Sequence, residues 1–314
     1  MASKIVTVTT NTAVDYVIEV DQLVLGGNLL ATHNQQFPSG KGVNVARTIE
    51  SLNCPVHVLG FVGEQSIGLF NRLQTQLLLT NFVQVSGQTR TNLTIFDQSS
   101  HAETHIRTTG FTVTPAYCKQ LHNQIEALLA PDDILILSGS LPPGAPADFY
   151  AELIELAHRK SASSILDSSG ESFRQGLQAR PNLVKPNQIE LEEFAGNPLL
   201  QEQDIVHAAY DLLKLGSEMV IVSRGAQGLL IVADNNIILK AYVNNLPHKI
   251  VTTIGCGDAL VGGLAVAKLR QFTLLESIKL ALSCATANLF SIEPGRFDQV
   301  QLSEISEHVV IRSL

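Results

Sequence analysis

Short apolar segments recur along this 314-residue chain, and the spacing leaves room for a helix between one segment and the next. Five of them have the composition of buried parallel strands: residues 56–62, 134–137, 164–166, 183–184 and 219–222. Residues 5–8 add a first strand near the N-terminus. This alternation predicts an α/β fold with a doubly wound, mostly parallel sheet flanked by helices.

Two regions, residues 12–38 and 88–110, break this rhythm. They are rich in alternating Val, Ile, Thr and Phe and lack helical periodicity, as in Tyr16–Val20 and Asn92–Phe96. We expect these strands to form a second, smaller sheet within a single domain that spans residues 1–314.

Polar clusters follow four of the predicted parallel strands, directly where each strand ends. They are Ser138-Gly139-Ser140, Asp167 to Gly170, Lys185-Pro186-Asn187 and Ser223-Arg224-Gly225. Ligands of parallel sheets bind outside the carboxyl ends of the strands, so these clusters predict a site at one edge of the sheet.

The stretch Thr253 to Asp258 ends in a carboxylate and runs into the helical pattern of residues 259–267. Small residues before a helix leave backbone N–H groups free, and the helix dipole adds positive charge, so an anion can bind there. Asp258 beside such an anion hole has the place of a base that deprotonates a hydroxyl during phosphoryl transfer. The alternative is an ordinary loop-to-helix turn with a favourable N-terminal charge.

A second glycine-rich helix entry lies at Phe37 to Arg47, where Val45, Ile49 and Leu52 have helical spacing. Asn44 falls near the first turn, where its amide can meet the hydroxyls of a ligand. The alternative interpretation makes Ser39 or Asn44 a helix cap.

In their joint order and spacing, these motifs resemble the ribokinase-like (phosphofructokinase-B) carbohydrate kinases. Within that family they resemble the branch of 1-phosphofructokinase, tagatose-6-phosphate kinase and the minor 6-phosphofructokinase. The resembling elements run along nearly the whole chain: residues 11–15, 39–47, 89–92, 138–144, 166–170, 184–191, 223–228 and 253–258. The resemblance implies a ribokinase-like fold in which the small sheet is a lid over the sugar and a surface for homodimerisation.

The resemblance also implies roles for individual residues. Asp258 is the general base, and the backbone amides of Gly255, Cys256 and Gly257 form the anion hole. The acceptor is held by residues from several motifs: Asp15, Gly40, Lys41, Asn44, Arg90, Arg107 and Ser140. An arginine fork suits a phosphate that the sugar already carries, and Arg90 is the closer match of the two arginines.

The nucleotide side of the site follows from the same resemblance. Lys185 and Asn187 reach the ATP phosphates, and Ser223, Gly225 and Gly228 form the nucleotide loop. Asn187, and Glu190 through water, serve Mg²⁺, which prefers hard oxygen ligands. ATP and Mg²⁺ are therefore the expected cofactors.

Composition narrows the class of partner. The formal net charge is −8 and no run of Lys or Arg occurs, so neither nucleic acid nor an anionic membrane is an expected partner. No apolar segment approaches the ~18 residues of a membrane helix. The four cysteines lack CxxC spacing, which favours reduced thiols in a cytoplasmic protein. His101 and His105 lack a third ligand and are expected at the surface.

We expect an ATP-dependent kinase that converts fructose 1-phosphate to fructose 1,6-bisphosphate. Tagatose 6-phosphate and fructose 6-phosphate are the alternative acceptors, because Thr12, Ser39 and Leu30 depart from the pattern of the branch near the sugar pocket. A kinase for a neutral sugar or nucleoside is disfavoured by Arg90. A regulator without catalytic activity on the same fold is the alternative from another class.

Overall fold

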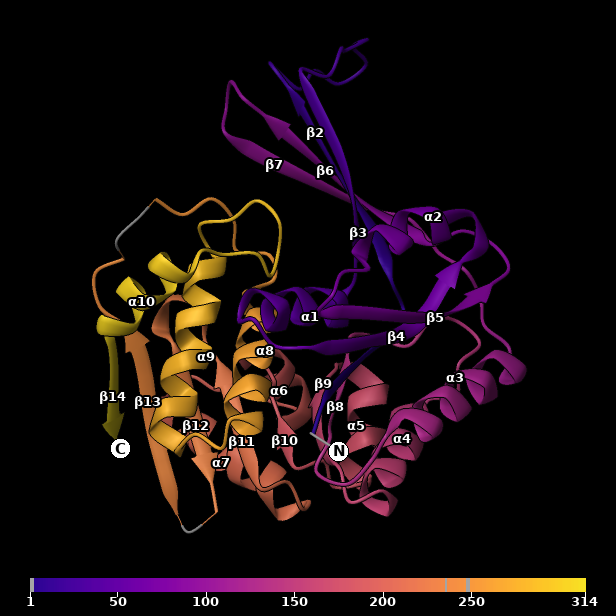
Figure 1. Cartoon of the computed structure of the whole chain (residues 1–314). Helices are drawn as coiled ribbons and strands as arrows, with labels where there is room; N and C mark the ends of the chain where they lie inside the picture. The colour runs from indigo at the N-terminus through magenta and orange to yellow at the C-terminus, as the bar shows by residue number, and fades with distance from the viewer. Residues whose placement is uncertain (1–2, 235, 247–248) are drawn as a thin grey trace.

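The computed structural model describes residues 3–234, 236–246 and 249–314, and it places most strands of these residues in one large sheet (Figure 1). The strand order of this sheet is β14-β13-β12-β11-β10-β9-β8-β1-β4-β5. The strand bounds in that order are Val309–Ser313, Ile237–Val243, Leu229–Ala233, Met219–Ser223, Leu183–Val184, Ser163–Asp167, Ile134–Ser138, Ile5–Thr9, Val56–Gly63 and Leu78–Val85.

The sheet is parallel from β5 to β11 and antiparallel from β11 to β14. All six strands predicted for the parallel sheet are present, which confirms the doubly wound α/β prediction. The parallel edge strand β5 and the antiparallel extension β12–β14 were not predicted. β11, β12 and β13 follow one another in the chain and pair directly with their neighbours, without a crossover helix, whereas β14 returns to pair with β13 only after the C-terminal helices.

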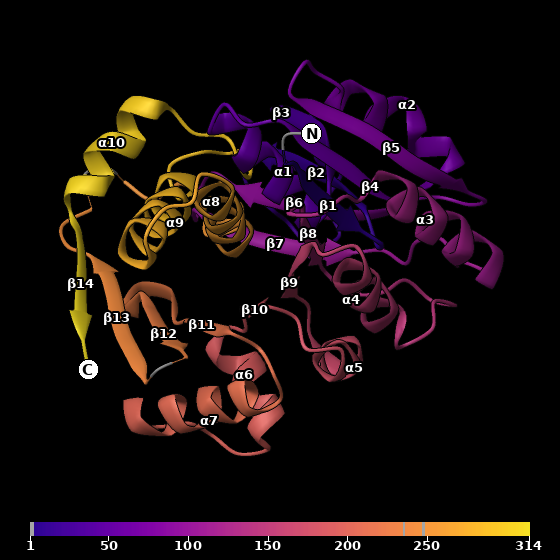
Figure 2. The ribbon, with the colours of Figure 1, turned by 60° about the horizontal axis from the view of Figure 1, so that its bottom comes forward.

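Helices cover both faces of the large sheet (Figure 2). Alternation along β8 shows why: Ile134 and Ile136 belong to the apolar core on one face, and Leu135 and Leu137 to the core on the other. The first face packs against α1 (Lys41–Ser51), α2 (Ile67–Phe70), α8 (Cys256–Leu269), α9 (Leu274–Asn288) and α10 (Gln299–Glu307). The second packs against α3 (Pro115–Leu128), α4 (Phe149–Arg159), α5 (Gly170–Gln178), α6 (Gln188–Ala195) and α7 (Glu202–Lys214).

A separate four-stranded sheet rises from one edge of the molecule (Figure 1). Its order is β3 (His33–Ser39), β2 (Ala13–Val20), β6 (Arg90–Asp97) and β7 (Ala102–Arg107), with β2 and β6 parallel. The second small sheet is therefore confirmed. Its register places Asp15 opposite Asn92, and Asn92 opposite Arg107, so three polar side chains lie across adjacent strands.

Across the described ranges, no helix combines the length and apolar character that crossing a lipid bilayer requires.

Candidate active site

The polar ends of β8, β9 and β10 meet at one edge of the large sheet, as the sequence predicts. The Gly139 amide donates to the Asp167 carbonyl at 2.9 Å, and the Lys185 amide donates to the Leu166 carbonyl at 3.2 Å. The Ser168 hydroxyl donates to the Gly139 carbonyl at 3.0 Å. These bonds hold the strand-end loops against one another, so their side chains share one site.

Asp167, the last residue of β9, is the fully buried centre of this edge. Its Oδ1 atom lies 3.2 Å from Lys185 Nζ and 3.3 Å from Lys41 Nζ. Burial alone would raise the pKa of Asp167, but Lys185 and Lys41 outweigh it and hold that pKa below its usual range. The negative charge of Asp167 in turn raises the pKa of Lys41. Two ammonium groups are thereby fixed beside one carboxylate.

Residue-level prediction did not assign Asp167 a role, although its cluster was predicted to lie at the site. The lysines that pair with it come from α1 and from the segment after β10, so only the fold brings them together. Its second oxygen, Oδ2, is buried and accepts no hydrogen bond from the described residues. A charged strand-end residue inside an otherwise apolar pattern was the available signal.

The predicted anion hole lies at the start of α8, which begins at Cys256. Gly255 precedes it with φ at +83°, and a Cβ atom at this position would lie 2.6 Å from Pro294 Cβ. Conformation and space therefore both require glycine there. A Cβ at Gly257 would lie 3.4 Å from Lys185 Nζ, so Lys185 lies beside the first turn of the helix, whose first amides have no partner within the helix.

Asp258, in the first turn of α8, is buried and faces α1. Asn44 Nδ2 donates to Asp258 Oδ2 at 2.9 Å. Burial raises the pKa of Asp258 to about 7, with Asp167 adding to the rise, while Lys41, Asn44 and Lys185 oppose it. A carboxylate with such a pKa can take up and release a proton near neutral pH.

The start of α1 is capped by Gly40, and no side chain bonds to the free amides there. The capping alternative is therefore wrong for both candidates. The Ser39 hydroxyl instead donates to Asp15 Oδ2 at 2.7 Å, and Asn44 serves Asp258. Both side chains face the site.

Several residues predicted to bind the sugar acceptor lie where the small sheet joins the large one. Asn92 donates to Asp15 Oδ1 at 2.7 Å. The Arg90 guanidinium donates to the carbonyl of Asn11 at 3.1 Å and to that of Thr12 at 3.4 Å. Burial, and then the positive charge of Arg107, lowers the pKa of Arg90. The register places Arg107 opposite Asn92, two residues along β6 from Arg90, so the two arginines lie on adjacent strands of the small sheet.

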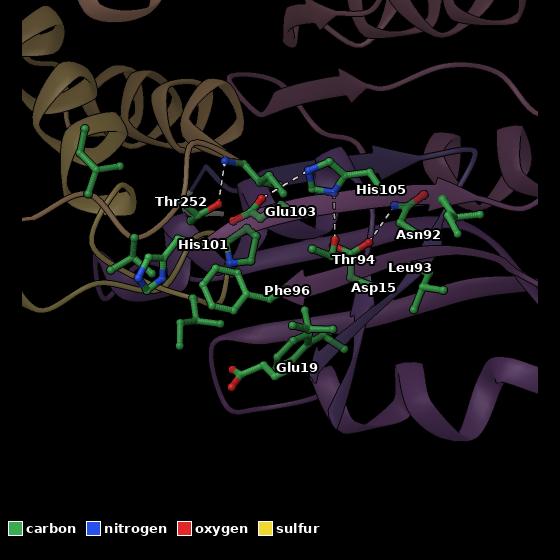
Figure 3. Close-up of a pocket in the computed structure, with 18 of the residues that line it drawn as sticks. Asp15, Glu19, Asn92, Leu93, Thr94, Phe96, His101, Glu103, His105 and Thr252 are labelled. Atoms are coloured by element: carbon green, nitrogen blue, oxygen red, sulfur yellow. Dashed lines mark hydrogen bonds and ion pairs between the residues drawn. The ribbon is translucent and has the colours of Figure 1, made fainter. Parts of the chain in front are cut away.

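A cavity of about 680 Å³ lies between the small sheet and two loops, residues 249–254 and 292–294 (Figure 3). Asp15, Asn92 and Arg107 line it. His101 and His105 are exposed, as expected, but they also line this cavity, which the sequence did not predict. The cavity is therefore lined both by residues predicted to bind the acceptor and by residues of the small sheet and the two loops that were not assigned to the site.

The remaining residues predicted for the site lie at the ends of β8, β10 and β11 and in the segments that follow these strands. The Ser140 hydroxyl accepts from Asn11 Nδ2 at 3.1 Å. Asn187 and Glu190 bond to each other in a capping box that starts α6, with both distances 2.8 Å. Asn187 also bridges to Ser223 at the end of β11. Gly225 and Gly228 flank the next turn, before β12.

A buried carboxylate beside the start of a helix and two lysines is an arrangement suited to phosphoryl transfer to an alcohol. The chain belongs to the pfkB family of carbohydrate kinases, which it matches over residues 6–296. It is therefore an enzyme that transfers a phosphoryl group to a sugar hydroxyl.

Individual relatives agree with this family. The chain is 33% identical to 1-phosphofructokinase of Bacillus subtilis over 95% of its own length and 96% of that protein. It is 32% identical to 1-phosphofructokinase of Escherichia coli, with 98% of both chains covered. The structure of Escherichia coli phosphofructokinase-2 with potassium superposes with a TM-score of 0.88, at 27% identity over 97% and 98% of the two chains. Arabidopsis thaliana ribokinase shares the fold, with a TM-score of 0.74 at 19% identity over 98% and 99%.

Proposed function

We propose that this enzyme transfers the γ-phosphoryl group of ATP to the 6-hydroxyl of fructose 1-phosphate and produces fructose 1,6-bisphosphate. The observation that carries the proposal is Asp258, a buried carboxylate whose pKa is raised to about 7 at the start of α8. Relatives that align over nearly their whole length are named 1-phosphofructokinase, which supports the choice of acceptor.

In this mechanism Asp258 takes the proton of the attacking hydroxyl. Asn44 binds one carboxylate oxygen and leaves the other available for the acceptor. The amides of Gly255, Cys256 and Gly257 stabilise the negative charge that grows on the transferred phosphoryl group. Lys41 and Lys185, held by Asp167, add positive charge at the same place.

The acceptor occupies the junction of the two sheets. Asp15 and Gly40 bind its hydroxyls, while Arg90, Arg107 and Ser140 bind its phosphate. The register of β6 and β7 supports this assignment, because it places Arg107 opposite Asn92, two residues from Arg90, and a bound phosphate would lower the repulsion between the two guanidinium groups. Closure of the small sheet as a lid, formed by residues 12–38 and 88–110, would exclude water from the phosphoryl donor.

The nucleotide is assigned to the turn with Ser223, Gly225 and Gly228. The side chains of the α6 capping box, Asn187 and Glu190, offer hard oxygen donors of the kind that Mg²⁺ prefers. Asn187 and Glu190 would hold the ion, the second through water. Mg²⁺ neutralises charge on the ATP phosphates when it is bound.

The test is ADP release with ATP and Mg²⁺ against fructose 1-phosphate, fructose 6-phosphate, tagatose 6-phosphate, fructose, ribose and adenosine. We expect the highest kcat/KM with fructose 1-phosphate. Preference for another phosphosugar would rename the acceptor, and activity with neutral acceptors alone would refute the role of Arg90. A lack of activity with every acceptor would favour the alternative of a regulator without catalytic activity. The presence of Asp258, Asn187 and Glu190 argues against that alternative.

We also propose a cytoplasmic homodimer that forms through the small sheet. The loop between β2 and β3 supports the dimer, since Leu25 is 96% exposed and Leu30 is 91% exposed. Apolar side chains clustered on one loop favour burial against a second copy. Escherichia coli phosphofructokinase-2 has been described in a tetrameric inhibited form.

A further inference from the structure

Arg47 is a buried charged residue that the proposed mechanism does not use. Its side chain lies on α1, one turn after Asn44, and the residue is only 1% exposed. Burying a guanidinium group is costly unless its donors are bonded or paired with an opposite charge. The contacts of Arg47 therefore deserve a functional explanation.

Three different segments meet at this guanidinium. Nη2 donates to the Pro38 carbonyl of β3 at 2.7 Å, and Nε lies 3.0 Å from Glu293 Oε1 in the segment after α9. Nη1 donates to Asn44 Oδ1 at 3.3 Å. Arg47 thus connects a strand of the small sheet, the helix that carries Asn44 and a C-terminal loop.

The bond to Asn44 determines which way that amide points. An arginine only donates, so it must face the amide oxygen of Asn44. The amide nitrogen is then left to donate to Asp258 Oδ2, as observed at 2.9 Å. The reversed amide would set its oxygen against the carboxylate and its nitrogen against the guanidinium, and both contacts would be repulsive.

The contact to Glu293 leads to the anion hole. Asn288 accepts from the Gly295 amide at 2.7 Å and donates to the Ile254 carbonyl at 2.7 Å. Glu293 and Gly295 belong to the same short loop, so Arg47 braces the loop that packs against the start of α8. Both halves of the catalytic centre are therefore supported from one side chain.

We propose that Arg47 is a positioning residue for phosphoryl transfer, which acts through Asn44 to orient and stabilise the Asp258 carboxylate. The proposal rests on the base role proposed for Asp258 and deepens it. Loss of Arg47 frees the Asn44 amide to turn, and the carboxylate then loses a donor. Protonation of Asp258 becomes easier, so the fall of kcat/KM on the acid side of the pH profile, the acid limb, moves to higher pH.

A double-mutant cycle tests the proposal: Arg47→Gln, Asn44→Ala and the pair, each assayed for kcat/KM between pH 5.5 and 9. We expect Arg47→Gln alone to lower kcat/KM about tenfold at pH 7 and to shift the acid limb upward. In the Asn44→Ala background the same substitution should change the rate less than about twofold. Asp258 also faces Lys41, Asp167 and Lys185, which all four proteins retain.

Arg296→Gln is the matched control, because Arg296 pairs with Glu50 at 2.6 Å and its loss removes the same charge from the same region. It should leave the acid limb in place. Arg47→Lys keeps the positive charge but lacks the several N–H donors of the guanidinium group. It replaces Arg47→Gln in the cycle if the Arg47→Gln variant does not fold.

Rate losses that multiply in the double mutant, or an acid limb that Arg47→Gln leaves unmoved, would overturn the inference. A different result would contradict the role of Asp258 as the base. Full turnover of Asp258→Asn would refute it, whatever the cycle shows.

Discussion

Asp258 owes its chemistry to its surroundings more than to its residue type. Burial favours the neutral acid, whereas Lys41, Lys185 and the Asn44 amide favour the carboxylate. These opposing effects leave the pKa close to neutrality instead of near 4, the ordinary value for aspartate. The residue can therefore accept a proton from a hydroxyl and still release it within a catalytic cycle.

Two results follow for this carboxylate. We expect Asp258→Asn to lower kcat by about 10²–10⁴-fold with little change in nucleotide affinity, because only the base is lost. In the wild type the base must be ionised, so kcat/KM should be level above pH 7 and fall about tenfold per unit below it. Steady-state kinetics from pH 5.5 to 9 and calorimetric ATP titration measure both. A comparable loss of ATP affinity would contradict the assignment.

Arg90 carries the prediction for the acceptor. Among the described residues, its half-buried guanidinium donates to two backbone carbonyls and forms no ion pair, so within this part of the chain it can bind a phosphate without losing a carboxylate partner. We expect Arg90→Ala to raise the acceptor KM about 10–100-fold, the size of a lost charge-assisted contact, with the ATP KM unchanged.

Arg159→Ala is the control for this experiment, because Arg159 is an exposed residue in the last turn of α4. It should behave as the wild type. Equal effects of Arg90→Ala on both KM values would show that Arg90 is structural.

At the scale of elements, two helices place polar groups at the candidate site from their first turns. α8 presents its free amides and Asp258, and α1 presents Asn44 to the same point. The start of α6 differs, because side chains form hydrogen bonds there. In its capping box the side chains of Asn187 and Glu190 each accept a hydrogen bond from the backbone N–H of the other residue. The residues assigned to Mg²⁺ are thereby held in place before any ion binds.

Gly255→Ala tests whether the start of α8 sets the rate. A side chain at φ +83° costs about 1–2 kcal/mol, and contact with Pro294 would displace the anion hole. We expect lower stability in urea and a large loss of kcat.

Gly196→Ala is the matched control, with φ at +74° and no atom near the added Cβ. It should lose similar stability from the backbone and keep its kcat. If both variants keep full activity, the position of the α8 start does not limit catalysis.

At the scale of the whole molecule, the sequence predicted what depends on local patterns. An apolar run followed by a polar cluster is contained in a few residues, so most of the parallel strands and the gathering of polar residues at their ends were predictable, whereas β5 was missed. The partners of Asp167 were not, because Lys41 lies 126 residues away along the chain. Arg47 shows the same limit, since an arginine on a helix is usually exposed and only tertiary packing buries it.

The small sheet supplies the last prediction, which concerns assembly. Leu25 and Leu30 project from the loop between β2 and β3, and a second copy would bury them. We expect the wild type to sediment as a dimer and Leu25→Glu/Leu30→Glu to sediment as a monomer, because two carboxylates per chain would be buried at the interface. Leu200→Glu is the control, since Leu200 is 89% exposed but lies between α6 and α7. A monomeric wild type, or a dimer that survives the double substitution, would place the interface elsewhere or remove it.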